Sequence, residues 1–352
     1  MRTVQDVVGS LQSEQLPVLK EPEYHNSGVT NKVALAVGSM KTHMSDEGWQ
    51  IMQGLQLYSY TLCGKGMEVG STDVASIVAR TNPGIVVMQD KREWDPQHNR
   101  LAFRSEQFSG LDALKDRSDI FKLTILKDSH QHPAYHRQSA DEIGCHGWII
   151  YYHPQIVKHL ATYVRPEHCI RTYHSLDPLL VPKFDSFDRH GCLLSGAYNS
   201  VYPLRAALFS AVSNLPDVTT ILHPGYINTA CHTPEYLQSL SRHKVAICTS
   251  SIYGYSLRKI IEATACGCIV ITDLPVDDVL PFIDDNLIRL SYNTVKEQVN
   301  EVREMLPSLY QSYNYARQQD IAEKAQLWYN YRSACGRLAE DIDNLRRSYG
   351  AW

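Results

Sequence analysis

A stretch of the chain at residues 244–273, KVAICTSSIYGYSLRKIIEATACGCIVITD, combines an apolar run with closely spaced charges. The run ends at a serine pair that includes Ser251, and the periodicity predicts a helix over residues 256–266. The first turn of a helix exposes N–H groups and the positive end of its dipole, an arrangement that favours an anion. Arg258 and Lys259 lie in this turn, where cations oppose the dipole unless a bound anion such as a diphosphate compensates them.

Glu262 lies about one helical turn beyond Arg258 and Lys259 and shares their face. A carboxylate at this position could accept two hydrogen bonds from the hydroxyls of a ribose. A solvated salt bridge between Arg258 and Glu262 explains the same spacing equally well. The residues alone leave both interpretations open.

Two further strand ends carry candidate binding residues. In LLSGAYNSVYPLR, residues 193–205, a strand meets a Gly-Ala turn and a helix with Pro203 in its first turn. Arg205 then projects near the carboxyl end of the strand, although an ordinary surface arginine is the alternative. The sequence HPGY, residues 223–226, follows another strand. It is either a simple turn or a loop in which Tyr226 contacts a ligand.

The best candidate for a general base follows the apolar run at residues 122–127. Asp128, His130 and His132 occupy the turn beyond it, and ligands bind at the carboxyl ends of strands in open α/β sheets. Aspartate and histidine can both accept a proton near neutral pH. Asp128 could instead form an Asx turn or a helix cap, and the histidines could be packed turn residues or contact a substrate.

Short, continuously apolar runs alternate with amphipathic stretches along most of the chain. Continuous apolar character is typical of strands covered on both faces, and this alternation predicts parallel sheets wound in the Rossmann manner. The expected strands are residues 32–38, 84–89, 122–127, 147–152, 169–173, 192–197, 218–223, 244–249, 268–272 and 286–290. The expected helices are residues 46–62, 72–80, 154–163, 202–213, 234–241, 256–266 and 294–305, with two more within 309–347.

A turn-rich break at residues 178–189, with two prolines and clustered aspartates, divides this pattern into two halves. We therefore expect an N-terminal lead-in at residues 1–30 and a first Rossmann-like domain at residues 31–180. A second Rossmann-like domain would occupy residues 181–310. Helices over residues 311–352 would cross back to the first domain.

Composition limits the classes of function. The 352 residues are 43% hydrophobic and 20% charged, which is ordinary for a globular protein with a sizeable core. The apolar runs are too short to span a membrane, no secretory signal is visible, and the nine cysteines lack CxxC pairing, so we expect a cytoplasmic protein with reduced thiols. A net charge of −4 gives no general attraction for nucleic acid. The paired aspartates are not placed as a metal-binding DxD motif, and we expect no metal bound by the protein.

The stretch RKIIEATACGCIVITD resembles the signature helix of GT-B glycosyltransferases. This resemblance implies an α/β fold of two Rossmann-like domains facing each other across a cleft, with a nucleotide-sugar donor bound to the second. It also implies that Glu262 binds the donor ribose, that Arg205 clamps the diphosphate and that Tyr226 lies against the base. Many retaining members carry another acidic residue where this chain has Gly254, which favours an inverting reaction. The expected donor-binding residues are Arg205, Tyr226, Ser251, Arg258, Lys259 and Glu262.

The segment around Asp128 is similar, more loosely, to the phage DNA β-glucosyltransferase, which implies that Asp128 is the general base. On the acceptor side we also expect Ser39 and Lys41, from a single-glycine turn that does not match a GxGxxG dinucleotide motif, and His132. The acceptor is expected to be a glycan or a hydroxymethylated base in DNA. A DNA substrate requires a basic groove, for which the cluster Lys91, Arg92, Arg100 and Arg104 is the available source.

These observations predict a glycosyltransferase that moves a hexose or pentose from a nucleotide sugar, UDP-linked in preference to GDP-linked, to a hydroxyl group. No other cofactor is expected. A nucleotide-sugar epimerase of the same fold is the alternative.

Overall fold

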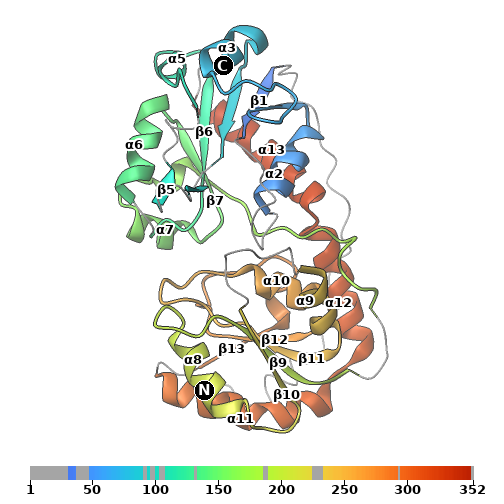
Figure 1. Ribbon diagram of the computed structural model, residues 1–352. Helices are drawn as coiled ribbons and strands as arrows, with labels where there is room; N and C mark the ends of the chain where they lie inside the picture. The colour runs from blue at the N-terminus through green and yellow to red at the C-terminus, as the bar shows by residue number, and fades with distance from the viewer. Residues whose placement is uncertain are drawn as a thin grey trace. The chain divides into compact units, whose positions relative to one another are not determined.

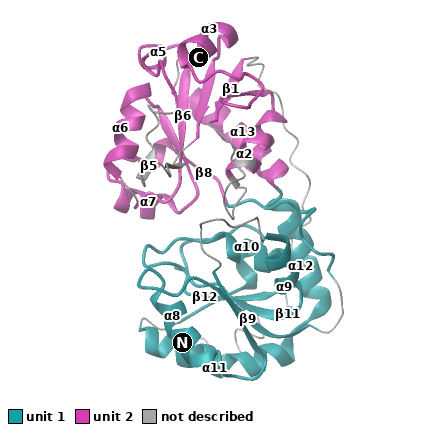
Figure 2. Ribbon diagram, in the orientation of Figure 1, with its two compact units in different colours: residues 1–21, 174–330 teal, residues 22–173, 331–352 magenta. Residues whose placement is uncertain are grey.

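The computed structural model describes residues 31–36, 47–89, 93–95, 100–102, 108–130, 133–184, 189–223, 233–291 and 294–349. These residues divide into two compact units, which Figure 2 shows in different colours. Among them, unit 1 runs from His174 to Asn330, whereas unit 2 combines the chain up to Tyr173 with the chain from Tyr331 onward. Each unit holds a parallel β-sheet with interleaved helices (Figure 1). The expected α/β class, with two parallel sheets, is confirmed.

Unit 2 contains a six-stranded parallel sheet in the order β2-β1-β3-β6-β7-β8. Its strands are β1 (Lys32–Leu35), β2 (Tyr60–Cys63), β3 (Ile85–Met88), β6 (Phe121–Leu126), β7 (Gly147–Ile150) and β8 (Cys169–Arg171), and β4 (Glu93–Asp95) pairs with β5 (Arg100–Ala102) in a separate antiparallel hairpin. Its helices are α2 (Glu47–Gln56), α3 (Val74–Thr81), α5 (Asp112–Lys115), α6 (Pro133–Ile143), α7 (Pro154–Leu160), the 3₁₀ turn η1 (Pro166–His168) and α13 (Tyr331–Ser348).

Unit 1 contains a five-stranded parallel sheet in the order β10-β9-β11-β12-β13. Its strands are β9 (His190–Gly196), β10 (Val218–Leu222), β11 (His243–Ile247), β12 (Ile269–Thr272) and β13 (Leu287–Arg289). Its helices are α8 (Pro203–Val212), α9 (Thr233–Ser241), α10 (Arg258–Ala265), η2 (Asp284–Asn286), α11 (Val295–Ser312) and α12 (Tyr315–Trp328). Helices α8 and α11 cover one face of this sheet and α9, α10 and α12 the other (Figure 1).

Every apolar run expected to be a strand contains one, and the central strands are buried on both faces. All six residues of β6 are buried, as are all four of β1, β3 and β7. Side chains alternate between the two faces of a strand. On β1, Val33 and Leu35 accordingly join the apolar cluster with α3, α5 and α6, whereas Lys32 reaches Asp343 on α13. The continuous apolar pattern is therefore the expected consequence of helices on both faces.

The expected helix at residues 46–62 is wrong in its second half. Helix α2 ends at Gln56, and Ser59 takes a left-handed backbone conformation with φ 68° before β2 begins at Tyr60. The aromatic and β-branched residues of β2 pair in parallel with β1, and this pairing outweighs the helical periodicity that continues into them.

The C-terminal region has the three expected helices, but the first of them is longer than expected. Helix α11 does not stop before Pro307 but continues through it to Ser312, and α12 and α13 follow as separate helices. Helix α13 packs on α2 in unit 2, where Gly54 permits the close approach because a Cβ there would lie 2.2 Å from the Cys335 Sγ. Segments near the two ends of the described chain thus build one half of the molecule.

Candidate functional site

The candidate binding residues of unit 1 lie near the point where four neighbouring parallel strands end. Strand β9 ends at Gly196 and β10 at Leu222, and β11 and β12 lead directly to Thr249 and Asp273. Parallel strands place these ends at one edge of the sheet, and helices α8 and α10 begin beyond the same edge. This edge is the usual location for a ligand in an open α/β sheet.

Arg205 lies in the first turns of α8, which begins with Pro203 at a position where a missing N–H costs nothing. Its side chain is not on the surface, because the residue is only 2% exposed. The guanidinium donates to the Thr249 hydroxyl at 3.1 Å and carbonyl at 2.9 Å and to the Ala197 carbonyl at 3.1 Å, and it lies 4.1 Å from the centre of the Tyr202 ring. Burial lowers the pKa of this guanidinium.

Lys259 is the second residue of α10 and reaches back toward the end of β9. Its ammonium donates to the Ser195 hydroxyl at 3.2 Å and lies 5.4 Å from the centre of the Tyr236 ring. Burial lowers the pKa of Lys259 to about 8, and the neighbouring charge of Arg205 acts in the same direction. The amine is therefore still protonated in most molecules at neutral pH.

Gly196 brings these two cations together. A Cβ at this position would lie 2.5 Å from the Lys259 Nζ and 2.8 Å from an Arg205 Nη, and the backbone φ of +118° also favours glycine. Within the described part of the chain, no carboxylate lies at ion-pair distance from either cation. These two like charges repel each other where little water screens them, and an anionic ligand would reduce that repulsion.

Glu262 and Arg258 form an ion pair with an N–O distance of 3.0 Å. The solvated salt bridge left open by the sequence is incorrect in one respect: the two side chains are 8% and 12% exposed. Lys259, one position after Arg258, instead reaches toward Ser195 and Tyr236. The two basic residues of this turn therefore have different partners. Arg258 pairs with the Glu262 carboxylate on α10, whereas Lys259 contacts Ser195 on β9.

The loop after β11 is held by its neighbours on both sides. The Ile252 N–H donates to the Val201 carbonyl at 2.9 Å, and the Ser250 N–H donates to Asp273. The Ser251 hydroxyl accepts a hydrogen bond from the Tyr253 N–H at 3.2 Å and is thereby part of the turn. Burial raises the pKa of the Asp273 carboxyl, and the backbone hydrogen bond opposes that shift.

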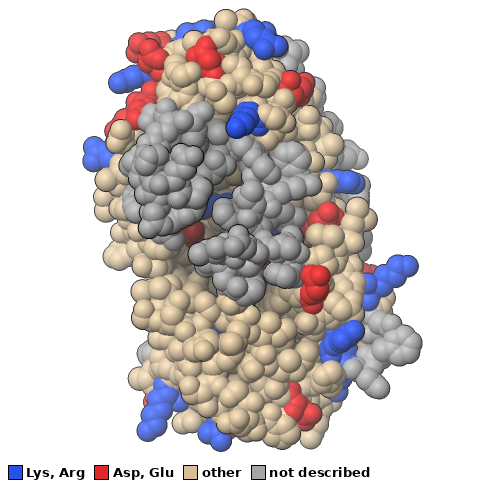
Figure 3. All heavy atoms as spheres, in the orientation of Figure 1, with Lys and Arg blue, Asp and Glu red and all other residues tan. Residues whose placement is uncertain are grey.

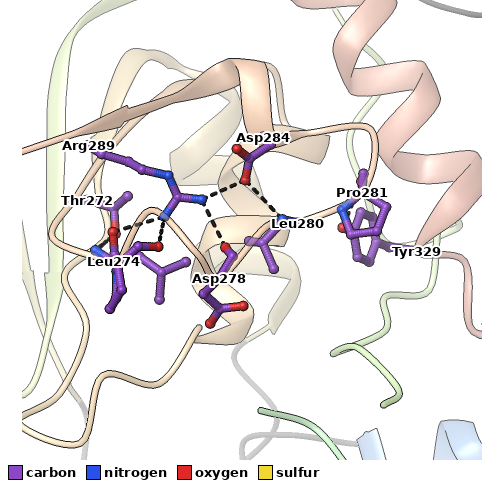
Figure 4. A network of polar contacts seen from close by, with 9 residues as sticks. Thr272, Leu274, Asp278, Leu280, Pro281, Asp284, Arg289 and Tyr329 are labelled. Atoms are coloured by element: carbon purple, nitrogen blue, oxygen red, sulfur yellow. Dashed lines mark hydrogen bonds and ion pairs between the residues drawn. The ribbon is translucent and has the colours of Figure 1, made fainter. Parts of the chain in front are cut away.

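The loop after β12 is organised by Arg289 on β13, as Figure 4 shows. Its guanidinium donates to the carbonyls of Leu274 and Asp278, each at 2.9 Å, and to the Asp284 carboxylate at 2.6 Å. The same carboxylate accepts from the Leu280 N–H at 2.9 Å. An arginine at the neighbouring strand end thus fixes the course of the loop that leaves the site edge.

His223 follows β10 at the same edge. Burial lowers the pKa of its imidazole, and the charges of Lys259 and Arg205 lower it further. Tyr226, three residues later, lies outside the described residues.

In unit 2, Asp128 lies past the carboxyl end of β6, as expected, with a backbone φ of 29° in the left-handed region that aspartate tolerates better than most residues. The Tyr152 hydroxyl, beyond the end of neighbouring β7, donates to the Asp128 Oδ1 at 3.0 Å. His130 is partly buried in the following turn. His132, Ser39 and Lys41 lie outside the described residues.

The structure thus brings Arg205, Arg258, Lys259 and Glu262 to one edge of one sheet, with the Ser251 turn beside them. Sequence reasoning missed Ser195, Gly196, Tyr236 and Thr249, which shape the surroundings of the cations. Ser195 and Gly196 end a predicted strand, and this position is a usable signal. Tyr236 lies within α9 and gave none.

Within the described residues, no helix combines the length and apolarity needed to cross a bilayer, and no three His, Cys, Asp or Glu side chains gather as metal ligands would.

Comparisons with known proteins give structural but no sequence relatives. No family model matches the chain, and no curated protein matches it. HepE from Anabaena, solved with UDP-glucose, is 12% identical with a TM-score of 0.55 over 89% of this chain and 100% of its own. Sucrose-phosphate synthase from Thermosynechococcus elongatus is 10% identical with a TM-score of 0.57 over 90% and 100% of the two chains. A glycosyltransferase from Rickettsia africae is 10% identical with a TM-score of 0.52 over 90% and 99%.

These likenesses establish the fold. The chain shares the two-domain α/β architecture of GT-B glycosyltransferases.

Proposed function

We propose that this chain is a glycosyltransferase that binds a nucleoside-diphosphate sugar at the site edge of unit 1 and transfers the sugar to a hydroxyl group. The observation that carries the proposal is the pair of cations, Arg205 and Lys259, that meet at Gly196 without a described carboxylate at ion-pair distance from either. A diphosphate would accept hydrogen bonds from both cations, and charge-assisted hydrogen bonds are among the strongest that proteins form. The UDP-glucose complex of HepE, which has the same fold, supports a uridine nucleotide.

Glu262 would bind the ribose of the donor. Its Oε1 atom takes part in the ion pair with Arg258. A carboxylate accepts hydrogen bonds through both oxygens, so Glu262 can receive the two hydroxyls of a ribose. Tyr226 is proposed to lie against the base and Ser251 near the phosphates.

The chemical step follows from these assignments. The acceptor oxygen attacks the anomeric carbon, the bond between that carbon and the diphosphate oxygen breaks, and the acceptor proton passes to Asp128. Negative charge grows on the departing diphosphate, where Arg205 and Lys259 stabilise it more strongly than in the ground state. The hydrogen bond from Tyr152 would hold the Asp128 carboxylate in place for proton transfer. We propose inversion at the anomeric carbon because Gly254 occupies the position of a second acidic residue.

For the acceptor we propose a glycan or a hydroxymethylated base in DNA. Lys and Arg side chains are interspersed with Asp and Glu over the described surface seen in Figure 3, and this view shows no basic stripe along the described part. A duplex needs a basic surface to follow its phosphates. We propose to test both acceptor classes in one assay. Ser39, Lys41 and His132 are proposed to lie on the acceptor side.

Binding measurements test the donor assignment directly. In calorimetry, UDP should bind far more tightly than uridine, and its affinity should fall as the pH rises through about 8, where Lys259 loses its charge. The terminal phosphate is ionised above about pH 6, so its own titration does not produce this loss. Equal affinities for UDP and uridine, or a UDP affinity that is constant from pH 7 to pH 10, would contradict the proposal.

Labelled sugars test the reaction. UDP- and GDP-linked sugars are incubated with the protein alone, with a glycan panel and with hydroxymethylated DNA. Transfer of label to a glycan or to DNA identifies the acceptor class. Interconversion of the sugar without an acceptor would show an epimerase instead.

A further inference from the structure

We propose that Tyr236 is a positioning residue that acts through the hydroxyl of Ser195 to aim the ammonium of Lys259 at the donor phosphate. This inference rests on the proposed function, because it assigns a ligand to the ammonium. It adds a second layer to the site: α9, which contributes none of the expected donor-binding residues, orients one that α10 contributes.

The proposal starts from an unbroken chain of hydrogen bonds. The Lys259 Nζ donates to the Ser195 Oγ at 3.2 Å, and the Ser195 Oγ is 3.0 Å from the Tyr236 hydroxyl. Ser195 is 5% exposed, so its hydroxyl depends on protein partners for most of its hydrogen bonds. The three residues come from α10, β9 and α9, and no two are neighbours in the sequence.

The tyrosine restricts how the serine can turn. A serine hydroxyl carries one donor and two acceptor sites and rotates freely unless its partners hold it. The hydrogen bond between Ser195 and Tyr236, in which either hydroxyl can donate, fixes the serine side chain so that an acceptor site of its oxygen faces Lys259. Burial raises the pKa of the Tyr236 phenol far above its ordinary value, so this group stays neutral and keeps its proton.

The ring of Tyr236 acts on the same ammonium from a second side. The Lys259 Nζ lies 5.4 Å from the ring centre, within the range of a cation–π interaction. An ammonium has three N–H groups. The Ser195 bond occupies one of them, and the ring limits the directions open to the other two. A lysine has many rotamers in water, and this arrangement removes most of that freedom before the donor arrives.

Other charged and titratable groups also face Lys259 and influence the pKa of its ammonium. They are Arg205 on α8, His223 after β10, Cys248 after β11 and Glu262 on α10. Replacement of Tyr236 by phenylalanine leaves all of them in place and keeps the ring. Tyr236→Phe therefore removes only the hydroxyl that orients Ser195.

A double-mutant cycle tests the proposal with UDP as the probe. Tyr236→Phe should weaken UDP binding about three- to tenfold, the range for one hydrogen bond, and leave uridine binding unchanged. Ser195→Ala should weaken UDP binding at least as much. The double variant should be no weaker than Ser195→Ala alone, because Tyr236 acts through Ser195. Additive losses would overturn the proposed route.

A second measurement reads the ammonium without any ligand. Competitive labelling of lysine amines across pH 6–10, followed by mass spectrometry, gives the titration midpoint of Lys259. Tyr236→Phe should lower this midpoint, because a poorly aligned acceptor stabilises the charged amine less. An unchanged midpoint would overturn the positioning role even if the protein binds UDP. Failure of the wild-type protein to bind UDP at any pH, with a shifted midpoint in the variant, would overturn the proposed function and leave the Tyr236–Ser195–Lys259 coupling supported.

Tyr313→Phe is the matched control. It removes a tyrosine hydroxyl that donates to the Gly267 carbonyl at 2.7 Å, before β12 begins and away from the site edge. This variant should unfold more readily but show the wild-type Lys259 midpoint and UDP affinity. If the Lys259 midpoint shifts as much in Tyr313→Phe as in Tyr236→Phe, the shift reflects a general loss of stability in unit 1. That result would overturn the proposal.

Discussion

The lysines that pack into the two units have different kinds of partner. In unit 2, the Lys32 Nζ lies 3.1 Å from the Asp343 carboxylate, and the Lys122 Nζ donates to three carbonyls at the end of α5, at 2.8, 3.3 and 3.1 Å. In unit 1, Lys259 meets a serine hydroxyl, an aromatic ring and a second cation. The lysines of unit 2 have partners that suit a structural role, whereas Lys259 has no described carboxylate at ion-pair distance and is proposed to bind a ligand.

The carboxyl edges of the two sheets also carry different groups. The unit 1 edge holds the cations expected to face the leaving diphosphate, and the unit 2 edge presents Asp128, steadied by Tyr152. A glycosyl transfer needs both kinds of group, positive charge for the leaving group and a base for the acceptor. Substitutions in each unit should therefore separate catalysis, stability and donor affinity.

The largest effect is expected at the unit 2 edge. Asp128→Asn should lower turnover by about two to four orders of magnitude, the usual contribution of a positioned general base, with donor affinity unchanged. Asparagine has the same size and also tolerates a positive φ, so the turn should persist. Single-turnover kinetics and UDP titration measure the two effects separately.

His130→Asn is the control, because His130 is the competing base two residues away. It should retain most of the turnover. If His130→Asn abolishes turnover and Asp128→Asn does not, histidine is the base.

The next effect contrasts Lys32 in unit 2 with Lys259 in unit 1. Lys32→Met should lower the free energy of unfolding by about 3–5 kcal/mol, because it removes the ion pair of a buried carboxylate, that of Asp343. Lys259→Met should leave the unfolding free energy unchanged or raise it, since it removes a partly buried cation next to another. The same variant should lose UDP affinity. Denaturant unfolding of both variants measures the contrast.

The double variant Lys32→Met with Asp343→Leu should recover much of the lost stability, because both charges are then gone. Equal destabilisation by Lys32→Met and Lys259→Met would show that Lys259 is structural as well.

A smaller effect is expected at the carboxylate of unit 1. Glu262→Ala should weaken UDP binding roughly ten- to two-hundredfold, the range for one hydrogen bond to a charged group at about 1.5–3 kcal/mol. Binding of uridine should weaken by a similar factor, since ribose is common to both ligands. Wild-type affinities in calorimetry, with an intact fold, would show that Glu262 serves only its ion pair with Arg258.

The order of strands and helices could be predicted because it depends on local patterns. Runs such as those of β6 and β12 are continuously apolar, and only a strand with helices on both faces buries them completely. The pattern failed at β2, whose four residues continue a helical periodicity and become a strand only through pairing with β1. A local pattern does not contain that partner.

In the candidate site, too, one part follows from local spacing and another part does not. The sequence by itself determined that Arg258, Lys259 and Glu262 share one helix near its N-terminus, because their spacing and the helical period suffice. Only the tertiary structure decided how Lys259 differs from Arg258. The turn of α10 directs Lys259 toward β9, where Gly196 leaves room for it beside Arg205 and where Tyr236 arrives from α9. Local spacing sets which side chains can face the same way, whereas burial and partners come from residues far apart in the chain.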